Sequence, residues 1–175
     1  IEMVVMGRSR SISLFGSPDA SDFRIARDCM EMLGIGHLAQ RPIRSLSGGE
    51  RQLVLVAQAL AGQCAVMVLD EPTAALDFHN QETMLQLLHG LARYRGITVL
   101  FTTHNPQHAA LIAGTTLAMT PDGGVVCGPS EVVLEDGRLS ELYGMDVRTV
   151  AFPVDGRIER SVLPLFRLNE RPGSP

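Results

Sequence analysis

The chain has 175 residues, of which 45% are hydrophobic and 19% charged, with a formal net charge of −4. This composition is typical of a globular domain and excludes a disordered chain, which buries too little apolar surface to offset its entropy. The net negative charge gives no electrostatic reason to expect nucleic-acid binding. No apolar run reaches the roughly 20 residues of a membrane-spanning helix.

The first third of the chain predicts helices separated by loops. Residues 1–8 are an apolar segment, and a Ser-, Gly- and Pro-rich loop follows through Pro18. Ser21 and Asp22 offer cap oxygens to a helix that ends at Gly34. After a second loop, another apolar helix ends before Gly62.

The middle of the chain predicts a strand, a helix and a second strand. Residues 65–69 are a short continuous apolar run, which is typical of a strand buried on both faces of a parallel sheet. Asp77 caps a helix, Gly96 ends it, and residues 97–102 form a second buried strand. Such a unit is a right-handed crossover.

The last third predicts a short helix at 106–113 and two hairpins whose turns are Asp-Gly pairs. The hairpin strands fall at residues 115–119 and 125–127, and at 147–154 and 158–165, before a polar tail at 169–175. The three cysteines lie far apart without a CxxC spacing, so we expect reduced, buried thiols rather than disulfides or a zinc site: Cys29, Cys64 and Cys127.

The first chemical motif is Ser47-Gly48-Gly49-Glu50, at the start of a helix. Helix N-termini present unpaired N–H groups, and glycines let an anion approach the backbone closely, so the motif suits a phosphate clamp. A serine cap followed by flexible glycines explains the same residues.

The second motif is Asp70-Glu71-Pro72, where a buried strand ends in two carboxylates. Desolvated charges need compensation, which Mg²⁺ supplies. Asp70 suits a metal ligand, reached directly or through water, and Glu71 suits a general base for water. A polar strand end with a proline turn is the simpler alternative. His104 follows the next strand, so it is expected at the same sheet edge.

Together these residues resemble the ABC ATPase family, from residue 6 to residue 144. Residues 46–52 resemble the family signature motif, residues 69–72 Walker B with the catalytic glutamate, and residues 75–77 the D-loop. Thr103-His104 resembles the switch histidine. The resemblance implies an α/β fold, the C-terminal part of a P-loop NTPase domain with a parallel central sheet, flanking helices and a helical signature subdomain.

The resemblance also implies a role for each matching residue and a homodimer that shares two ATP molecules. Asp70 serves Mg²⁺, Glu71 is the general base, and His104 contacts the γ-phosphate. The remaining nucleotide-binding residues act from the opposing copy or couple the sites: Ser47, Gly48, Gly49, Glu50, Gln52 and Asp77. The implied division is a helical subdomain at 1–61, a catalytic half at 62–144 and a strand pair with tail at 145–175.

The chain departs from the family pattern in one respect. It has no GxxxxGK[ST] P-loop and no lysine, and no Q-loop glutamine precedes residues 3–8. We therefore expect an N-terminally truncated sequence that is poorly soluble, exposes apolar sheet surface and does not hydrolyse ATP alone.

Residues 3–8, 76–81 and 103–106 look most like the importer branch for iron-siderophore, haem or cobalamin chelates. That resemblance implies a peripheral subunit at the cytoplasmic face of the inner membrane, bound to permease subunits through a loop at 9–18. A periplasmic or surface binding protein acts only indirectly. The alternatives are a soluble ABC ATPase of DNA repair or chromosome maintenance, which the absence of heptads and basic tracts disfavours, and a non-catalytic remnant.

Overall fold

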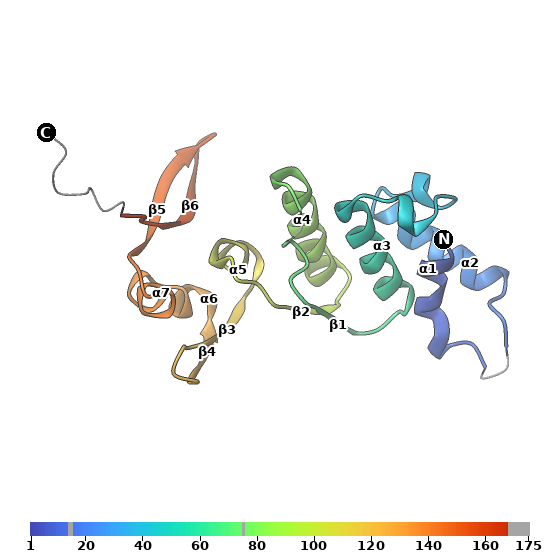
Figure 1. The fold of residues 1–175 in the computed structure, drawn as a ribbon, viewed down its shortest axis with the longest axis horizontal. Coiled ribbons are helices and arrows are strands. Elements are labelled where there is room, and N and C mark those ends of the chain that lie inside the picture. Colours follow the sequence, from blue (N-terminus) through green and yellow to red (C-terminus); the bar gives the residue numbers. More distant parts are fainter. Residues whose placement is uncertain (14–15, 75, 168–175) are drawn as a thin grey trace, which may run out of the picture. The chain divides into compact units, whose positions relative to one another are not determined.

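The computed structural model describes residues 1–13, 16–74 and 76–167, which form two compact units, Ile1–His104 and Asn105–Pro175 (Figure 1). The predicted tail at 169–175 lies outside the described residues. Both units combine helices with two-stranded sheets, which agrees with the α/β class expected from the sequence.

The N-terminal part of the first unit is a helical cluster in which α3 packs against α1 and α2 (Figure 1). Its core is apolar, with Val4, Met30, Leu38 and Val56 at most 2% exposed. Burial of these side chains holds the short helices together, since helices of this length are marginal alone. The elements are α1 Glu2–Val5, η1 Met6–Arg10, α2 Ala20–Met32, η2 Gly36–Leu38, η3 Ile43–Ser45 and α3 Gly48–Ala61.

The cap of α2 differs from the prediction. Asp19, not Ser21 or Asp22, is the N-cap, because its carboxylate accepts hydrogen bonds from Ser21 N at 2.7 Å and Asp22 N at 3.1 Å. Asp22 is the third residue of the helix, and its carboxylate accepts a hydrogen bond from Asp19 N at 3.2 Å in return. Two residues that the sequence offered as caps therefore lie inside the first turn, in a reciprocal capping box.

The strand–helix–strand unit is present as β1 Val66–Leu69, α4 Phe78–Tyr94 and β2 Thr98–Phe101. The strands pair in parallel, with Val66 opposite Thr98. Asp77 caps α4 by accepting from Asn80 N at 2.9 Å, and Gly96 ends the connection at φ +66, a conformation that favours glycine.

The expectation that both strands are buried on both faces is wrong for the part of the chain that is described. Met67 is 5% exposed, whereas Val66, Val68 and Leu100 are 56%, 69% and 60% exposed. Alternate residues of a strand point to opposite faces, and α4 packs on this small sheet, so one face is covered. The other face is the exposed apolar sheet surface that the sequence predicted.

The second unit contains the two predicted hairpins and two helices that the sequence analysis did not identify. The turn of the second hairpin has positive φ at both central residues, Asp155 at 49 and Gly156 at 77, which matches the preference of Asp-Gly for such turns. Its core joins Leu139, Val147 and Val162. The elements are α5 Pro106–Ile112, β3 Thr115–Met119, β4 Val125–Pro129, α6 Ser130–Val133, α7 Asp136–Tyr143, β5 Val147–Val154 and β6 Arg157–Pro164.

Side chains occupy both edges of the β5–β6 hairpin. On β6, the amide of Gln107 accepts from Val162 N at 2.7 Å and donates to Arg160 O at 3.2 Å. On β5, the Ser140 hydroxyl bonds to the main chain of Val147. These contacts replace the partners that a neighbouring strand would provide, so the helices fix the hairpin by its edges.

The thiols are free, but only Cys29 is buried, and burial raises its pKa. The expectation of buried thiols is wrong for Cys64 and Cys127, which are exposed at a helix end and on an edge hairpin. Within the described residues, every helix is too short or too polar to cross a membrane.

The Gln107 contacts lead to a stability prediction. Gln107→Ala removes two hydrogen bonds of about 1 kcal/mol each, so Val162 N is expected to exchange its hydrogen about tenfold faster or more. Gln86→Ala, on the α4 surface, is the matched control. Unchanged exchange at Val162 in the Gln107 variant would show that the amide does not hold the hairpin.

Candidate functional site

The carboxyl ends of β1 and β2 bring the predicted acidic residues and histidine to one edge of the first unit's sheet. Asp70 and Glu71 follow β1, while Thr102 and His104 follow β2. The pairing continues past the strands, with Thr102 N donating to Leu69 O at 3.0 Å. Parallel strands end at a common edge, so residues more than 30 positions apart in sequence come into contact.

Glu71 and His104 form a hydrogen-bonded pair. His104 Nδ1 lies 2.9 Å from Glu71 Oε1, so both residues lie at one sheet edge, where the sequence placed them. The other carboxylate oxygen, Oε2, is buried and has no hydrogen-bond partner within the described part of the chain. Buried acceptors are normally satisfied, so this oxygen is an exception among the described residues.

The backbone at Glu71 is strained. Its φ is +45, in the left-handed region that non-glycine residues seldom adopt, at a cost of order 1 kcal/mol. The Glu71 N–H donates to Thr102 Oγ1 at 2.9 Å, and its carbonyl accepts from Ala74 N at 3.2 Å. These bonds hold the residue in a conformation that directs its carboxylate toward His104.

The Thr102 hydroxyl was missed by the sequence analysis. It accepts from Glu71 N and donates to Asp70 Oδ1 at 2.6 Å, so one oxygen connects both carboxylate residues to β2. The signal available in the sequence was a threonine at the end of the strand that follows the acidic pair. The same position carries hydroxyls in many chains without a site, so the pattern alone does not single it out.

The Ser47 turn forms a capping box at the start of α3. Ser47 Oγ accepts from Glu50 N at 3.2 Å, and Glu50 Oε2 accepts from Ser47 N at 2.7 Å. The interpretation of Ser47 as a helix cap is therefore confirmed. The cap is compatible with phosphate binding, because the N–H groups of Gly48 and Gly49 belong to the first turn, where donors lack intrahelical acceptors.

Glu50 has its carboxylate engaged in this turn. The hydrogen bond from Ser47 N is the main cause that lowers its pKa below the ordinary glutamate value, and Arg41, 3.0 Å away, adds to the effect. The ionised carboxylate of Glu50 thus holds the Ser47 backbone in place by a hydrogen bond inside the same turn. The contacts of Glu50 stabilise the Ser47 turn. Gln52 lies one turn further along α3, where its side chain is half-buried.

The Ser47 turn packs against the start of α4. A side-chain carbon added at Gly49 would lie 3.3 Å from Leu76 Cδ2 and 3.6 Å from Asn80 Nδ2, so the backbone of the turn lies close to these two side chains. Asp77, between those two residues, caps α4. The predicted D-loop is therefore adjacent to the predicted signature turn, although its Ala75 lies outside the described residues.

The donor set at the sheet edge suits Mg²⁺ held partly by water. The described residues contain no group of three or more His, Cys, Asp or Glu side chains placed to hold a metal ion. Mg²⁺ uses one or two carboxylates, keeps several waters and takes substrate phosphates as further ligands. The exposed, hydrogen-bonded Asp70 provides one such carboxylate, so the residues present fit this mode of binding.

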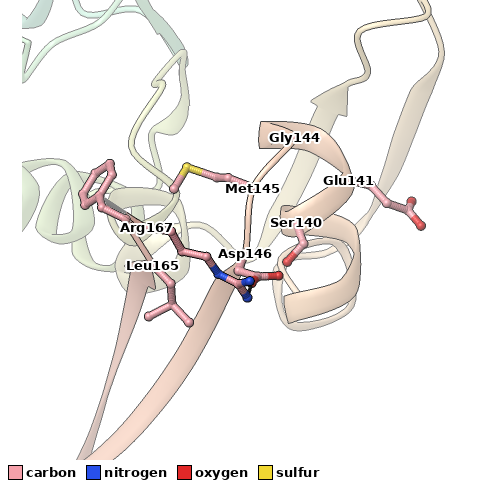
Figure 2. Close-up of a pocket in the computed structure, with 8 residues that line it drawn as sticks. Ser140, Glu141, Gly144, Met145, Asp146, Leu165 and Arg167 are labelled. Atoms are coloured by element: carbon pink, nitrogen blue, oxygen red, sulfur yellow. Dashed lines mark hydrogen bonds and ion pairs between the residues drawn. The ribbon is translucent and has the colours of Figure 1, made fainter. Parts of the chain in front are cut away.

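A cavity of about 780 Å³ in the second unit is separate from these residues. Figure 2 shows that Ser140, Met145, Asp146, Leu165 and Arg167 line it, with Arg167 paired to Asp146. None of the predicted site residues contributes to its wall. The reactive groups identified from the sequence gather at the sheet edge and at the start of α3.

Comparison with known proteins identifies the family to which the chain belongs. A family model described as "AAA domain, putative AbiEii toxin, Type IV TA system" matches residues 7–108, more than half of the chain. The chain belongs to this AAA-domain family, and the curated relatives that it matches over most of its length are ATP-binding subunits of ABC transporters.

Two of these relatives show the extent of the likeness. The molybdate import ATP-binding protein MolC of Haemophilus influenzae is 45% identical over 143 residues, which cover 82% of this chain and 56% of MolC. The iron(3+)-hydroxamate import ATP-binding protein FhuC of Bacillus subtilis is 36% identical over 152 residues, 87% of this chain and 56% of FhuC. The chain thus spans little more than half of either relative.

A solved structure supports the same fold. A chain of the structure "An inward-facing conformation of a putative metal-chelate type ABC transporter" matches with a TM-score of 0.91 and 36% identity, covering 94% of this chain and 65% of the other. The agreement confirms the expected P-loop NTPase class of fold.

The Thr102 hydroxyl generates a second prediction. Thr102→Val keeps the side-chain shape but removes both hydrogen bonds, so the unfolding free energy should fall by about 1–3 kcal/mol and the Glu71 amide should lose protection from exchange. Thr102→Ser retains the hydroxyl and is the matched control. Equal protection of the Glu71 amide in both variants would contradict the bridging role.

Proposed function

We propose that this chain supplies the hydrolytic carboxylates, switch histidine and signature turn of the ATP-hydrolysing subunit of an ABC importer. The observation that carries the proposal is the Glu71–His104 pair, 2.9 Å apart, beside the Thr102-held Asp70. The names of the relatives support import as the process.

In this proposal Glu71 is the general base of ATP hydrolysis. Its Oε2, which has no hydrogen-bond partner among the described residues, accepts the proton of a water as the water oxygen attacks the γ-phosphorus, and the bond to the β–γ bridging oxygen breaks to leave ADP and phosphate. His104 holds the other oxygen of Glu71 and faces the same phosphoryl group. Asp70 would hold Mg²⁺, directly or through water, and the bound ion would supply positive charge that neutralises the phosphates.

The signature turn serves the ATP of a second copy. Ser47 is fixed by its capping box, and Gly48 and Gly49 belong to the first turn of α3, whose N–H groups lack intrahelical acceptors and so suit a γ-phosphate presented from outside the chain. Glu50 stabilises this turn, Gln52 on the same helix contributes to nucleotide binding, and Asp77, next to the turn at the start of α4, couples the two shared sites. A homodimer is therefore the proposed working form.

The cargo is proposed to be a metal in chelated or oxyanion form. The sequence resemblance pointed to iron-siderophore, haem or cobalamin uptake, and the relatives include both an iron-hydroxamate and a molybdate importer, which widens the class. In this setting the subunit is peripheral at the cytoplasmic face of the inner membrane and bound to permease subunits. It contacts neither nucleic acid nor, directly, a binding protein.

A groove of about 610 Å³ in the first unit is the proposed permease contact. Met6, 60% exposed, and Phe23, 39% exposed, give it an apolar wall that a short amphipathic helix of a permease would cover. Ser9, Ile12 and other residues of the predicted contact loop line it as well.

The first experiment on this proposal changes Glu71 in the protein expressed from its complete coding sequence. Glu71→Gln removes the base but keeps the side-chain volume, so turnover should fall by roughly 10²–10⁴ while the Kd for ATP stays within about twofold. Glu82→Gln on α4 is the matched control. Turnover of the Glu71 variant near the wild-type rate would rule out the assigned role.

The second experiment maps the groove. A photocrosslinker at Met6 in the assembled transporter is expected to label a permease subunit, since this side chain is exposed in the groove. The same probe at Tyr94, 82% exposed at the end of α4, is the control and should label little permease. Stronger labelling from Tyr94 than from Met6 would move the contact away from the groove.

A further inference from the structure

A buried ion pair connects three segments of the first unit. Arg8 is 9% exposed and Asp22 6% exposed, and Arg8 Nε donates to Asp22 Oδ1 at 3.0 Å. Arg8 Nη1 also donates to Ala61 O at 3.1 Å and to Gln63 Oε1 at 2.8 Å. One guanidinium therefore links η1, the first turn of α2 and the end of α3.

The position of Arg8 at the end of α3 has an electrostatic reason. The last carbonyls of a helix lack intrahelical donors and carry partial negative charge, which a cation stabilises. Ala61 is the final residue of α3, so Arg8 satisfies one of these carbonyls. A buried guanidinium with unmet donors would be costly, so the three partner atoms, Asp22 Oδ1, Ala61 O and Gln63 Oε1, fix its geometry closely.

The backbone beside Arg8 adds a second constraint. A side-chain carbon at Gly7 would lie 2.0 Å from Gln58 O, far inside van der Waals contact. The main chain of η1 therefore lies directly against the last turns of α3. Gly7 and Arg8 together set both the distance of this helix from the N-terminal segment and its position along its own axis.

The opposite end of the same helix carries the signature turn. Ser47 is the N-cap of α3, 14 residues before Ala61, or roughly 21 Å at 1.5 Å per residue. The middle of the helix is locked into the core by Val56 and Ala57, both 0% exposed. A helix of this length moves as a rod, so a shift at Ala61 displaces Ser47.

We propose that Arg8 is a positioning residue that holds α3 in register and thereby aims Ser47 at the ATP of the second copy. The inference rests on the proposed function. Its consequence is that a defect at Arg8 impairs the site on the partner copy and spares the site formed by its own Glu71.

The test uses mixed dimers of the protein expressed from its complete coding sequence. The double variant Arg8→Met/Asp22→Leu removes both buried charges with little change in volume, which a folded core tolerates better than one unpaired charge. Its homodimer is expected to lose about tenfold or more in turnover with the Kd for ATP unchanged. Arg8→Lys, which keeps the charge, should lose less.

Mixed dimers separate an effect on the partner from an effect within the copy. A dimer of the double variant with Glu71→Gln retains one site made of an intact Glu71 and an intact Ser47 turn. Its turnover should therefore exceed that of both homodimers. The reference is Ser47→Arg mixed with Glu71→Gln, which creates the same complementation by design.

Each result decides a different statement. Recovery in the reference dimer without recovery in the Arg8 dimer would overturn the positioning role and leave the proposed function standing. Full turnover of the Arg8 double-variant homodimer would overturn it as well. Absence of recovery in the reference dimer would count against shared sites and so against the proposed function itself. If the double variant fails to fold, Arg8→Lys mixed with Glu71→Gln decides by the same comparison.

Discussion

The parallel pairing of β1 with β2 is the constraint on which the candidate site depends. It places the residues after each strand at one edge, and the Thr102 hydroxyl then ties Asp70 and the Glu71 backbone to β2. Without this pairing the two carboxylates and His104 would be separate loop residues. The strands are short, so a few main-chain bonds carry the geometry of the reactive groups.

The helical cluster holds the other half of the chemistry by fixing both ends of α3. At the start, Glu50 and Arg41 stabilise the Ser47 turn, and at the end Arg8 binds Ala61 O. Both attachments use charged groups, but the first is exposed and the second is buried. The exposed one adjusts readily to a ligand, whereas the buried one resists movement because separating its partners leaves a charge without compensation.

Helix caps, helix ends and turns were predictable from the sequence, whereas the burial of strands by other elements was not. The Ser47 and Asp77 caps, the Gly96 stop and the Asp155-Gly156 turn follow from residue preferences that act over a few positions. The burial of β1 was overestimated, since an apolar run does not state which element covers it. The Thr102 bridge and the Arg8–Asp22 pair join residues distant in sequence, so no local pattern reveals them.

At Glu71, the left-handed backbone conformation makes the residue that would favour stability different from the residue that the proposed reaction needs. A glycine there would relax the strained φ and remove a buried oxygen that has no partner among the described residues, so under the proposed function the fold would gain stability where hydrolysis loses its base. Under the proposed function, selection for turnover keeps a carboxylate at this point. In a duplicated gene copy that is no longer under that selection, Glu71 would be among the first residues to be replaced. The residue found at position 71 of such a copy would then indicate whether an ancestor still hydrolysed ATP.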